Sequence, residues 1–133
     1  MREILFMTEN ELARQIVDGA LRVHRSLGPG LLESVYETVL AFELKSRGLH
    51  TTCQQVIPVV YRGTRIEMGF RSDLIVEDKV IVEIKSVENV APVHKKQLLT
   101  YLRLADKRLG LLINFNVELI RDGIMRVANG MPD

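Results

Sequence analysis

Two acidic residues and a lysine form the strongest candidate for a catalytic site in this sequence. Asp73 is followed ten positions later by Glu83, and Lys85 completes a Glu-x-Lys pair. The residues between them are mostly Val and Ile, which is typical of two neighbouring strands. Side chains alternate between the two faces of a strand. We therefore expect Glu83 and Lys85 to share a face, with Asp73 pointing away from Phe70, Leu74 and Val76.

The register of this hairpin decides whether the two carboxylates meet. If the loop is centred on Asp78, Val76 pairs with Val80 and Asp73 lies opposite Glu83, whereas a loop of even length would break the alignment. Carboxylates facing each other across two strands repel, and a divalent cation such as Mg²⁺ turns that repulsion into coordination. The alternative is a surface hairpin whose charges are simply solvated. Helices covering both faces of the sheet would argue against it, because converging buried charges are costly.

Other polar residues are candidates for the same site. Glu33 opens a predicted helix, where it could reach a metal or simply interact favourably with the helix dipole. Gln97 and Tyr101 are one helical turn apart and lie off the apolar stripe of a later helix, so they could reach a phosphate or form an ordinary polar edge. That helix also carries basic residues suited either to the phosphate backbone or to a solvated face: Lys95, Lys96, Arg103, Lys107 and Arg108.

Hydrophobic periodicity supplies the elements that must position these residues. Thr8 and Glu11 form a capping-box pattern ahead of the first helix, and Gly28-Pro29-Gly30 ends it. Arg121-Asp122-Gly123 suggests a hairpin turn. Predicted helices cover 8–27, 31–47 and 91–107; predicted strands cover 51–61, 66–76, 79–87 and 109–115, followed by a hairpin over 118–127.

Composition limits the classes of function. The 133 residues, with 47% hydrophobic and 26% charged residues, suit a single soluble domain over 1–133. The net charge of +1 gives no overall basic signature. The single cysteine, Cys53, which we expect to be buried, rules out an internal disulfide and a Cys-rich zinc site. A charged start over 1–7 and the lack of an apolar run of about 20 residues predict a cytoplasmic location without membrane association.

Several short motifs, in order, resemble the GxxExxY protein family, a group assigned to the PD-(D/E)XK nuclease superfamily. The resemblance spans about residues 10–128. Ser72 stands where the superfamily name implies Pro. The motifs are Gly30-Leu-Leu-Glu33-Ser-Val-Tyr36, Tyr61-Arg-Gly63, Asp73-Leu-Ile-Val, Val82-Glu83-Ile-Lys85, Gln97-Leu-Leu-Thr-Tyr101-Leu and Gly110-Leu-Leu-Ile-Asn114-Phe115.

The resemblance implies a fold and a set of roles. The fold is α/β (an α+β mixed sheet) with a restriction-endonuclease-like core, in the order α-α-β-β-β-α-β-β with the last strands as a hairpin. Asp73, Glu83 and Glu33, with the backbone carbonyl of Ile84, would bind Mg²⁺ or Mn²⁺. Lys85 would be the catalytic lysine, and Gln97 and Tyr101 the auxiliary pair.

The expected function is metal-dependent hydrolysis of nucleic-acid phosphodiesters with low sequence specificity. DNA is the expected substrate ahead of RNA, although the sequence does not distinguish the two. Superfamily nucleases often act as dimers, so a homodimer is expected by analogy. Two alternatives stay open: a non-catalytic module that binds nucleic acid or protein, and a subunit of a larger assembly. Substrate structure, endo- or exonuclease action and the number of metal ions are not decided by the sequence.

Overall fold

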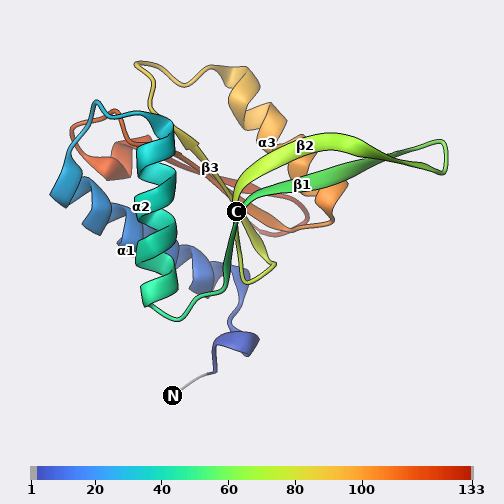
Figure 1. The fold of residues 1–133 in the computed structure, drawn as a ribbon, viewed down its shortest axis with the longest axis horizontal. Helices are drawn as coiled ribbons and strands as arrows, with labels where there is room; N and C mark the ends of the chain where they lie inside the picture. Colours follow the sequence, from blue (N-terminus) through green and yellow to red (C-terminus); the bar gives the residue numbers. More distant parts are fainter. Residues whose placement is uncertain (1–2, 133) are drawn as a thin grey trace.

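The computed structural model describes residues 3–132, so the outermost residues of the predicted domain lie outside the described part. Five strands form one mixed sheet in the order β1-β2-β3-β4-β5, with helices on both faces (Figure 1). This confirms the predicted fold class and element order. The elements are η1 (Ile4–Phe6), α1 (Glu9–Leu27), α2 (Glu33–Ser46), β1 (Thr51–Tyr61), β2 (Thr64–Val76), β3 (Val80–Lys85), α3 (Pro92–Ala105), β4 (Leu109–Asn114), η2 (Ile120–Gly123) and β5 (Ile124–Ala128).

The sheet topology follows from the connections. β1, β2 and β3 form an antiparallel meander, whereas β3 and β4 are parallel neighbours joined through α3. Parallel strands need such a crossover because a tight turn cannot return the chain to the same end. β3 and β4 form the middle of the sheet and are buried along almost their whole length, as expected for strands covered on both faces.

Two apolar cores lie on the two faces of the sheet. The larger core packs α1 and α2 against Leu74, Val76, Val82 and their neighbours in β4. The smaller core packs Leu98 and Leu102 of α3 against the opposite face. The two faces of β2 and β3 therefore both need apolar side chains, and polar groups are tolerated only where the strands leave these cores.

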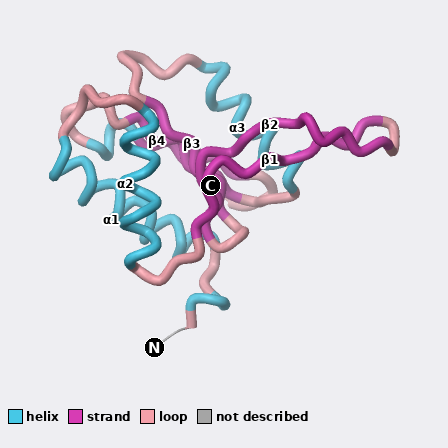
Figure 2. The backbone as a smooth tube through the Cα atoms, viewed as in Figure 1, coloured by secondary structure: helices cyan, strands magenta, loops and turns pink. Residues whose placement is uncertain are grey.

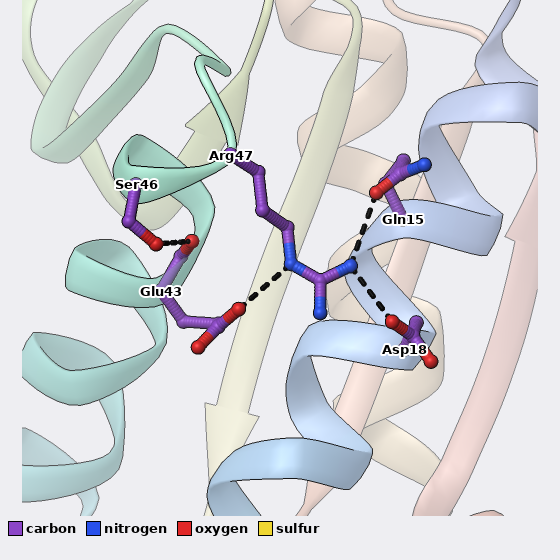
Figure 3. Close-up of polar contacts among 5 residues, drawn as sticks. All are labelled: Gln15, Asp18, Glu43, Ser46 and Arg47. Atoms are coloured by element: carbon purple, nitrogen blue, oxygen red, sulfur yellow. Dashed lines mark hydrogen bonds and ion pairs between the residues drawn. The ribbon is translucent and has the colours of Figure 1, made fainter.

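Helices α1 and α2 begin and meet through identifiable polar contacts. The hydroxyl of Thr8 accepts from the backbone N–H of Glu11, whose carboxylate accepts from Thr8, so the predicted capping box is confirmed. At the C-terminal end of α2, the Arg47 guanidinium lies 2.8 Å from carboxylate oxygens of both Asp18 and Glu43 (Figure 3). It also donates to Gln15 Oε1 at 3.0 Å, which ties α1 to α2.

Two local expectations were wrong. Residues 118–127 do not form a hairpin around Asp122-Gly123; the 3-10 turn η2 leads into a single strand, β5, which pairs with β4. Gly123 is needed there for another reason, because a Cβ would lie only 2.1 Å from the carbonyl oxygen of Asn114. Cys53 is exposed, since it lies on the outermost strand, β1.

No helix in residues 3–132 has the length and apolar character that a membrane span requires.

Candidate active site

The hairpin between β2 and β3 has the register that brings the acidic residues together. Val76 pairs with Val80, and the ladder continues through Ile75–Ile81 to Leu74–Val82. Beyond this point the backbone pairing gives way to side-chain contacts. The N–H of Ile84 donates to Asp73 Oδ2 at 2.8 Å, and the N–H of Asp73 donates to Glu83 Oε1 at 3.3 Å. The two carboxylates therefore lie side by side where the strands separate.

The alternation along β2 holds at this end of the strand and fails further out. Leu74 and Val76 belong to the core under α1 and α2, as predicted. Phe70, expected on the same face, instead stacks on Tyr101 of α3, with ring centroids 3.6 Å apart and planes 8° from parallel. Gln54 on β1 has a φ of 53°, and the β1–β2 register shifts beyond Ile57. The irregular backbone at Gln54 lies between Cys53, which pairs with Leu74, and Ile57, which pairs with Phe70, and the face changes across this stretch.

The electrostatics of the pair are dominated by burial and by the mutual repulsion of two carboxylates. Glu83 is only 9% exposed, and burial, followed by the charge of Asp73, raises the pKa of its carboxyl to about 9. Lys85 is half-buried and acts in the opposite direction, lowering the pKa of Glu83. Like charges that share a desolvated site suppress each other's ionisation. The arrangement consequently favours an additional positive charge.

Helix α2 adds a carboxylate that the sequence analysis missed. Gln54 donates from Nε2 to Glu37 Oε1 at 2.5 Å and to Asp73 Oδ1 at 3.2 Å, so one amide connects both acids. Burial, and to a smaller degree Asp73 and Glu33, raises the pKa of Glu37. Glu37 follows Glu33 by one helical turn and shares its face, a spacing that could have revealed it. No sequence signal marks Gln54.

The predicted Glu33 lies at the rim of this group. It accepts from the backbone N–H of Ser86 at 3.4 Å, and Ser86 Oγ donates to the carbonyl of Leu31 at 2.6 Å. Glu33 is therefore held at the end of β3, against the residue that follows Lys85. Among residues 3–132, no three His, Cys, Asp or Glu side chains are close enough to form a metal site by themselves.

The donor set nonetheless fits a hard divalent cation. Mg²⁺ commonly binds one or two carboxylates and completes its shell with water and substrate oxygens. Asp73 and Glu83 supply such a pair, and because burial and the charge of Asp73 raise the pKa of Glu83, a bound cation would favour its ionised form. A cation here would thus be held mainly by the carboxylates of Asp73 and Glu83, with Glu33 at the rim.

Helix α3 brings Tyr101 close to the acids, and its predicted partner Gln97 interacts with Tyr101. Burial, followed by the charges of Glu83 and Asp73, raises the pKa of Tyr101, and a hydrogen bond with Gln97 opposes this. Tyr101 is half-buried and Gln97 is exposed. The basic residues Lys95, Lys96 and Arg103 are exposed on the same helix, available to solvent or to a polyanion.

Two buried aromatic residues from the sequence motifs support the site without belonging to it. The hydroxyl of Tyr36 donates to the carbonyl of Gly28 at 2.5 Å and accepts from the N–H of Leu31 at 3.1 Å, and its ring stacks on Phe115. These contacts fix the loop that leads into Glu33. Gly30 has a φ of 97° in this loop, a conformation that favours glycine.

The side-chain amide of Asn114 fixes the chain on the other side of the site. Asn114 Oδ1 accepts from the N–H of Val87 at 3.1 Å, and its Nδ2 donates to the carbonyl of Val87 at 2.9 Å. The segment that leaves β3 after Lys85 is thereby tied to the end of β4.

Comparison with protein families agrees with this geometry. The sequence model described as the PD-(D/E)XK nuclease superfamily matches residues 10–127, which is most of the chain. The chain belongs to this superfamily. Searches of curated proteins and of solved structures found no match. PD-(D/E)XK membership indicates a hydrolase of the nuclease type, with nucleic acid as its class of substrate and a divalent metal ion as the usual cofactor.

Proposed function

We propose that this PD-(D/E)XK protein is a Mg²⁺- or Mn²⁺-dependent nuclease that hydrolyses nucleic-acid phosphodiesters with low sequence specificity. The observation that carries the proposal is the pair of carboxylates, Asp73 and Glu83, placed side by side at the opening between β2 and β3. Lys85, two residues after Glu83, influences the same carboxyl. Acidic ligands beside a lysine are the groups required to hold a cation and to position water at a phosphate.

The residues that would hold the ion follow from this arrangement. Asp73 and Glu83 would bind it directly, with the backbone carbonyl of Ile84, and Glu33 would contact it directly or through water. When bound, the ion would supply Lewis-acid stabilisation of the phosphate oxygens and lower the pKa of a water molecule. Glu37 acts on Asp73 through the amide of Gln54, which holds the carboxylate of Asp73 in place.

The remaining polar residues act on water and substrate. The ammonium of Lys85 would orient the attacking water and balance the negative charge that grows on the phosphate. Gln97 and Tyr101 would position the phosphate or Lys85 from the α3 side. Lys95, Lys96 and Arg103 would contact the nucleic-acid backbone, which carries no sequence information.

Several finer features belong to the same proposal. We assign the chain to the GxxExxY group because Gly30, Glu33 and Tyr36 have distinct roles in one loop and helix start. DNA is the proposed substrate, and RNA is the alternative that the experiment below includes. A homodimer and a cytoplasmic location complete the proposal.

The test is cleavage of labelled nucleic acids with Mg²⁺, Mn²⁺ or EDTA. Single-stranded, nicked and branched DNA, and the corresponding RNA, form the substrate panel. Asp73→Ala and Lys85→Ala should abolish cleavage. Their matched controls, Asp122→Ala and Lys45→Ala, remove the same charges at exposed positions away from the site and should cleave as the wild type does. Undiminished activity in Asp73→Ala or Lys85→Ala would refute the roles.

Calorimetry with Mn²⁺ provides a separate measurement of the metal site. Binding in the wild type and its loss in Asp73→Ala would support the assigned ligands. Nucleic-acid binding without metal uptake or cleavage would instead favour the non-catalytic module.

A further inference from the structure

The outer half of the β1–β2 hairpin extends away from the rest of the molecule. We call residues 56–71 the arm; it lies beyond the part of β2 that pairs with β3. Figures 1 and 2 show it as a two-stranded ribbon that projects past α3. At about 3.3 Å per residue, the ribbon from Val56 to Tyr61 is roughly 20 Å long. This length matches about six nucleotides of one strand.

The arm exposes several large apolar side chains, which are unusual on a hairpin that contacts only solvent. Met68 is 91% exposed and Tyr61 is 62% exposed, and Val60 and Ile66 are also open to solvent. Exposed apolar groups gathered on one element mark an interaction surface. The arm carries three arginines, Arg62, Arg65 and Arg71, and one acid, Glu67, which lies 2.6 Å from Arg65.

The root of the arm is built into the candidate active site. Arg71 is exposed and precedes Asp73 by two residues on the same strand. Phe70 stacks on Tyr101 of α3, so the arm is joined to the helix that borders the acidic pair. A polymer that passes the acidic pair would meet the arm on one side and the basic residues of α3 on another.

We propose that the arm is a nucleic-acid-binding element that grips the substrate strand beside the acidic pair; this inference rests on the proposed function. Arg62 and Arg71 contact phosphates. Tyr61 and Met68 pack against bases or sugars, because aromatic groups stack on any base and apolar side chains can wedge between base steps. Neither contact requires a particular sequence.

Charge favours nucleic acid over a second copy of the chain as the occupant. The arm has an excess of two positive charges although the whole chain has a net charge of only +1. Helix α2 and its cap expose apolar side chains, with Leu32 and Phe42 most accessible, against which a second copy's arm could pack. Lys45 is exposed one helical turn after Phe42 and would repel the arginines of the arm. A nucleic acid offers phosphates to the arginines and bases or sugars to the apolar groups.

The experiment measures binding by fluorescence anisotropy, with a labelled DNA duplex and its single strand, in EDTA over a range of NaCl. The double variant Arg62→Ala/Arg71→Ala should bind about tenfold more weakly, and its salt slope should fall by about 2. The matched control, Arg22→Ala/Arg25→Ala, removes the same charge from exposed positions on α1 and should bind as the wild type does. Equal effects in both double variants, or none in either, would overturn the proposal.

A second pair of variants tests the apolar contact. Tyr61→Ala should weaken binding severalfold, whereas Tyr61→Phe, which keeps the ring, should retain it. Phe42→Ala removes a comparably exposed ring from α2 and should have no effect. If Met68→Glu converts a dimer into a monomer by light scattering while nucleic-acid binding persists, the arm is instead an interface between copies, and the proposal fails.

The outcomes separate this inference from the proposed function. Loss of binding in the arm variants of a protein that cleaves no substrate would support the arm and refute the hydrolysis. If the wild type cleaves and the arm variants bind and cleave normally, the hydrolysis is supported and the role of the arm is refuted.

Discussion

Two clusters of charged residues lie along α2, and they differ in how their charge is balanced. Near the end of the helix, Arg47 is matched by Asp18 and Glu43 and by a hydrogen bond with Gln15 (Figure 3). In the first half of the helix, Glu37 lies close to both Glu33 and Asp73, and Asp73 in turn lies beside Glu83, on which Lys85 acts. The balanced cluster joins two helices. The unbalanced cluster has more carboxylates than cations, so it can bind a positively charged ligand.

The largest expected difference between the clusters is in catalysis. Asp73→Asn should lower metal-dependent cleavage by about 10²–10³-fold, because it removes one of the two charged ligands. Arg47→Ala, in the balanced cluster, should leave the cleavage rate per folded molecule unchanged. The measurement is the initial rate of cleavage, normalised to the folded fraction determined by circular dichroism. Equal losses of rate in both variants would show that the clusters are not functionally distinct.

The next effect is on the pH dependence of stability without metal. The folded-state pKa of Glu83, at about 9, lies above the ordinary value of 4.5. The folded protein therefore holds this proton more tightly, and the free energy of unfolding should fall as the pH rises through this interval. Glu83→Gln cannot ionise, so its melting temperature in EDTA should fall less towards pH 9 and exceed that of the wild type there. Parallel melting curves against pH for both proteins would contradict the raised pKa.

The balanced cluster should show its effect in stability. Arg47→Ala leaves Glu43 and Asp18 without their cation and should lower the free energy of unfolding by about 1–2 kcal/mol. The expected loss is kept low because Asp18 is largely exposed. Urea denaturation measures it, with Arg22→Ala, at an exposed position on α1, as the control. A change within error for both variants would mean that the contacts in Figure 3 contribute little.

The smallest expected effect belongs to Glu37. Glu37→Gln keeps a group that can bond to Gln54 but removes a carboxylate whose pKa is raised by burial. Its melting temperature in EDTA should rise by about 1–2 °C, while metal-dependent cleavage should fall only severalfold. Melting temperature and cleavage rate together distinguish Glu37→Gln from Asp73→Asn, whose loss of activity should be far larger. A loss as great as that of Asp73→Asn would make Glu37 a metal ligand in its own right.

The sequence was sufficient for those features that depend on local patterns. Apolar periodicity predicted the order of helices and strands, and Thr8 and Glu11 predicted the start of α1. The pairing of Val76 with Val80 followed from counting outward from Asp78, and the same count brought Asp73 beside Glu83. These predictions succeeded because neighbouring residues determine them.

Features that depend on distant packing were not predictable in the same way. The exposure of Cys53 depends on β1 being an outer strand, and the turn at Gly123 depends on its contact with the end of β4. Phe70 changes face because of irregular backbone on β1. The arm looked like an ordinary pair of strands, since the sequence does not show which strands lack a neighbour in the sheet.

Asn114 links β4 to the geometry of α3. Its amide makes both hydrogen bonds to the backbone of Val87, and thus imitates one rung of a sheet where no strand continues. The direction in which the chain departs from β3 is set there, only a few residues before α3 begins at Pro92. A strand that contributes no reactive group thus anchors the segment that leads from Lys85 to the helix carrying Tyr101.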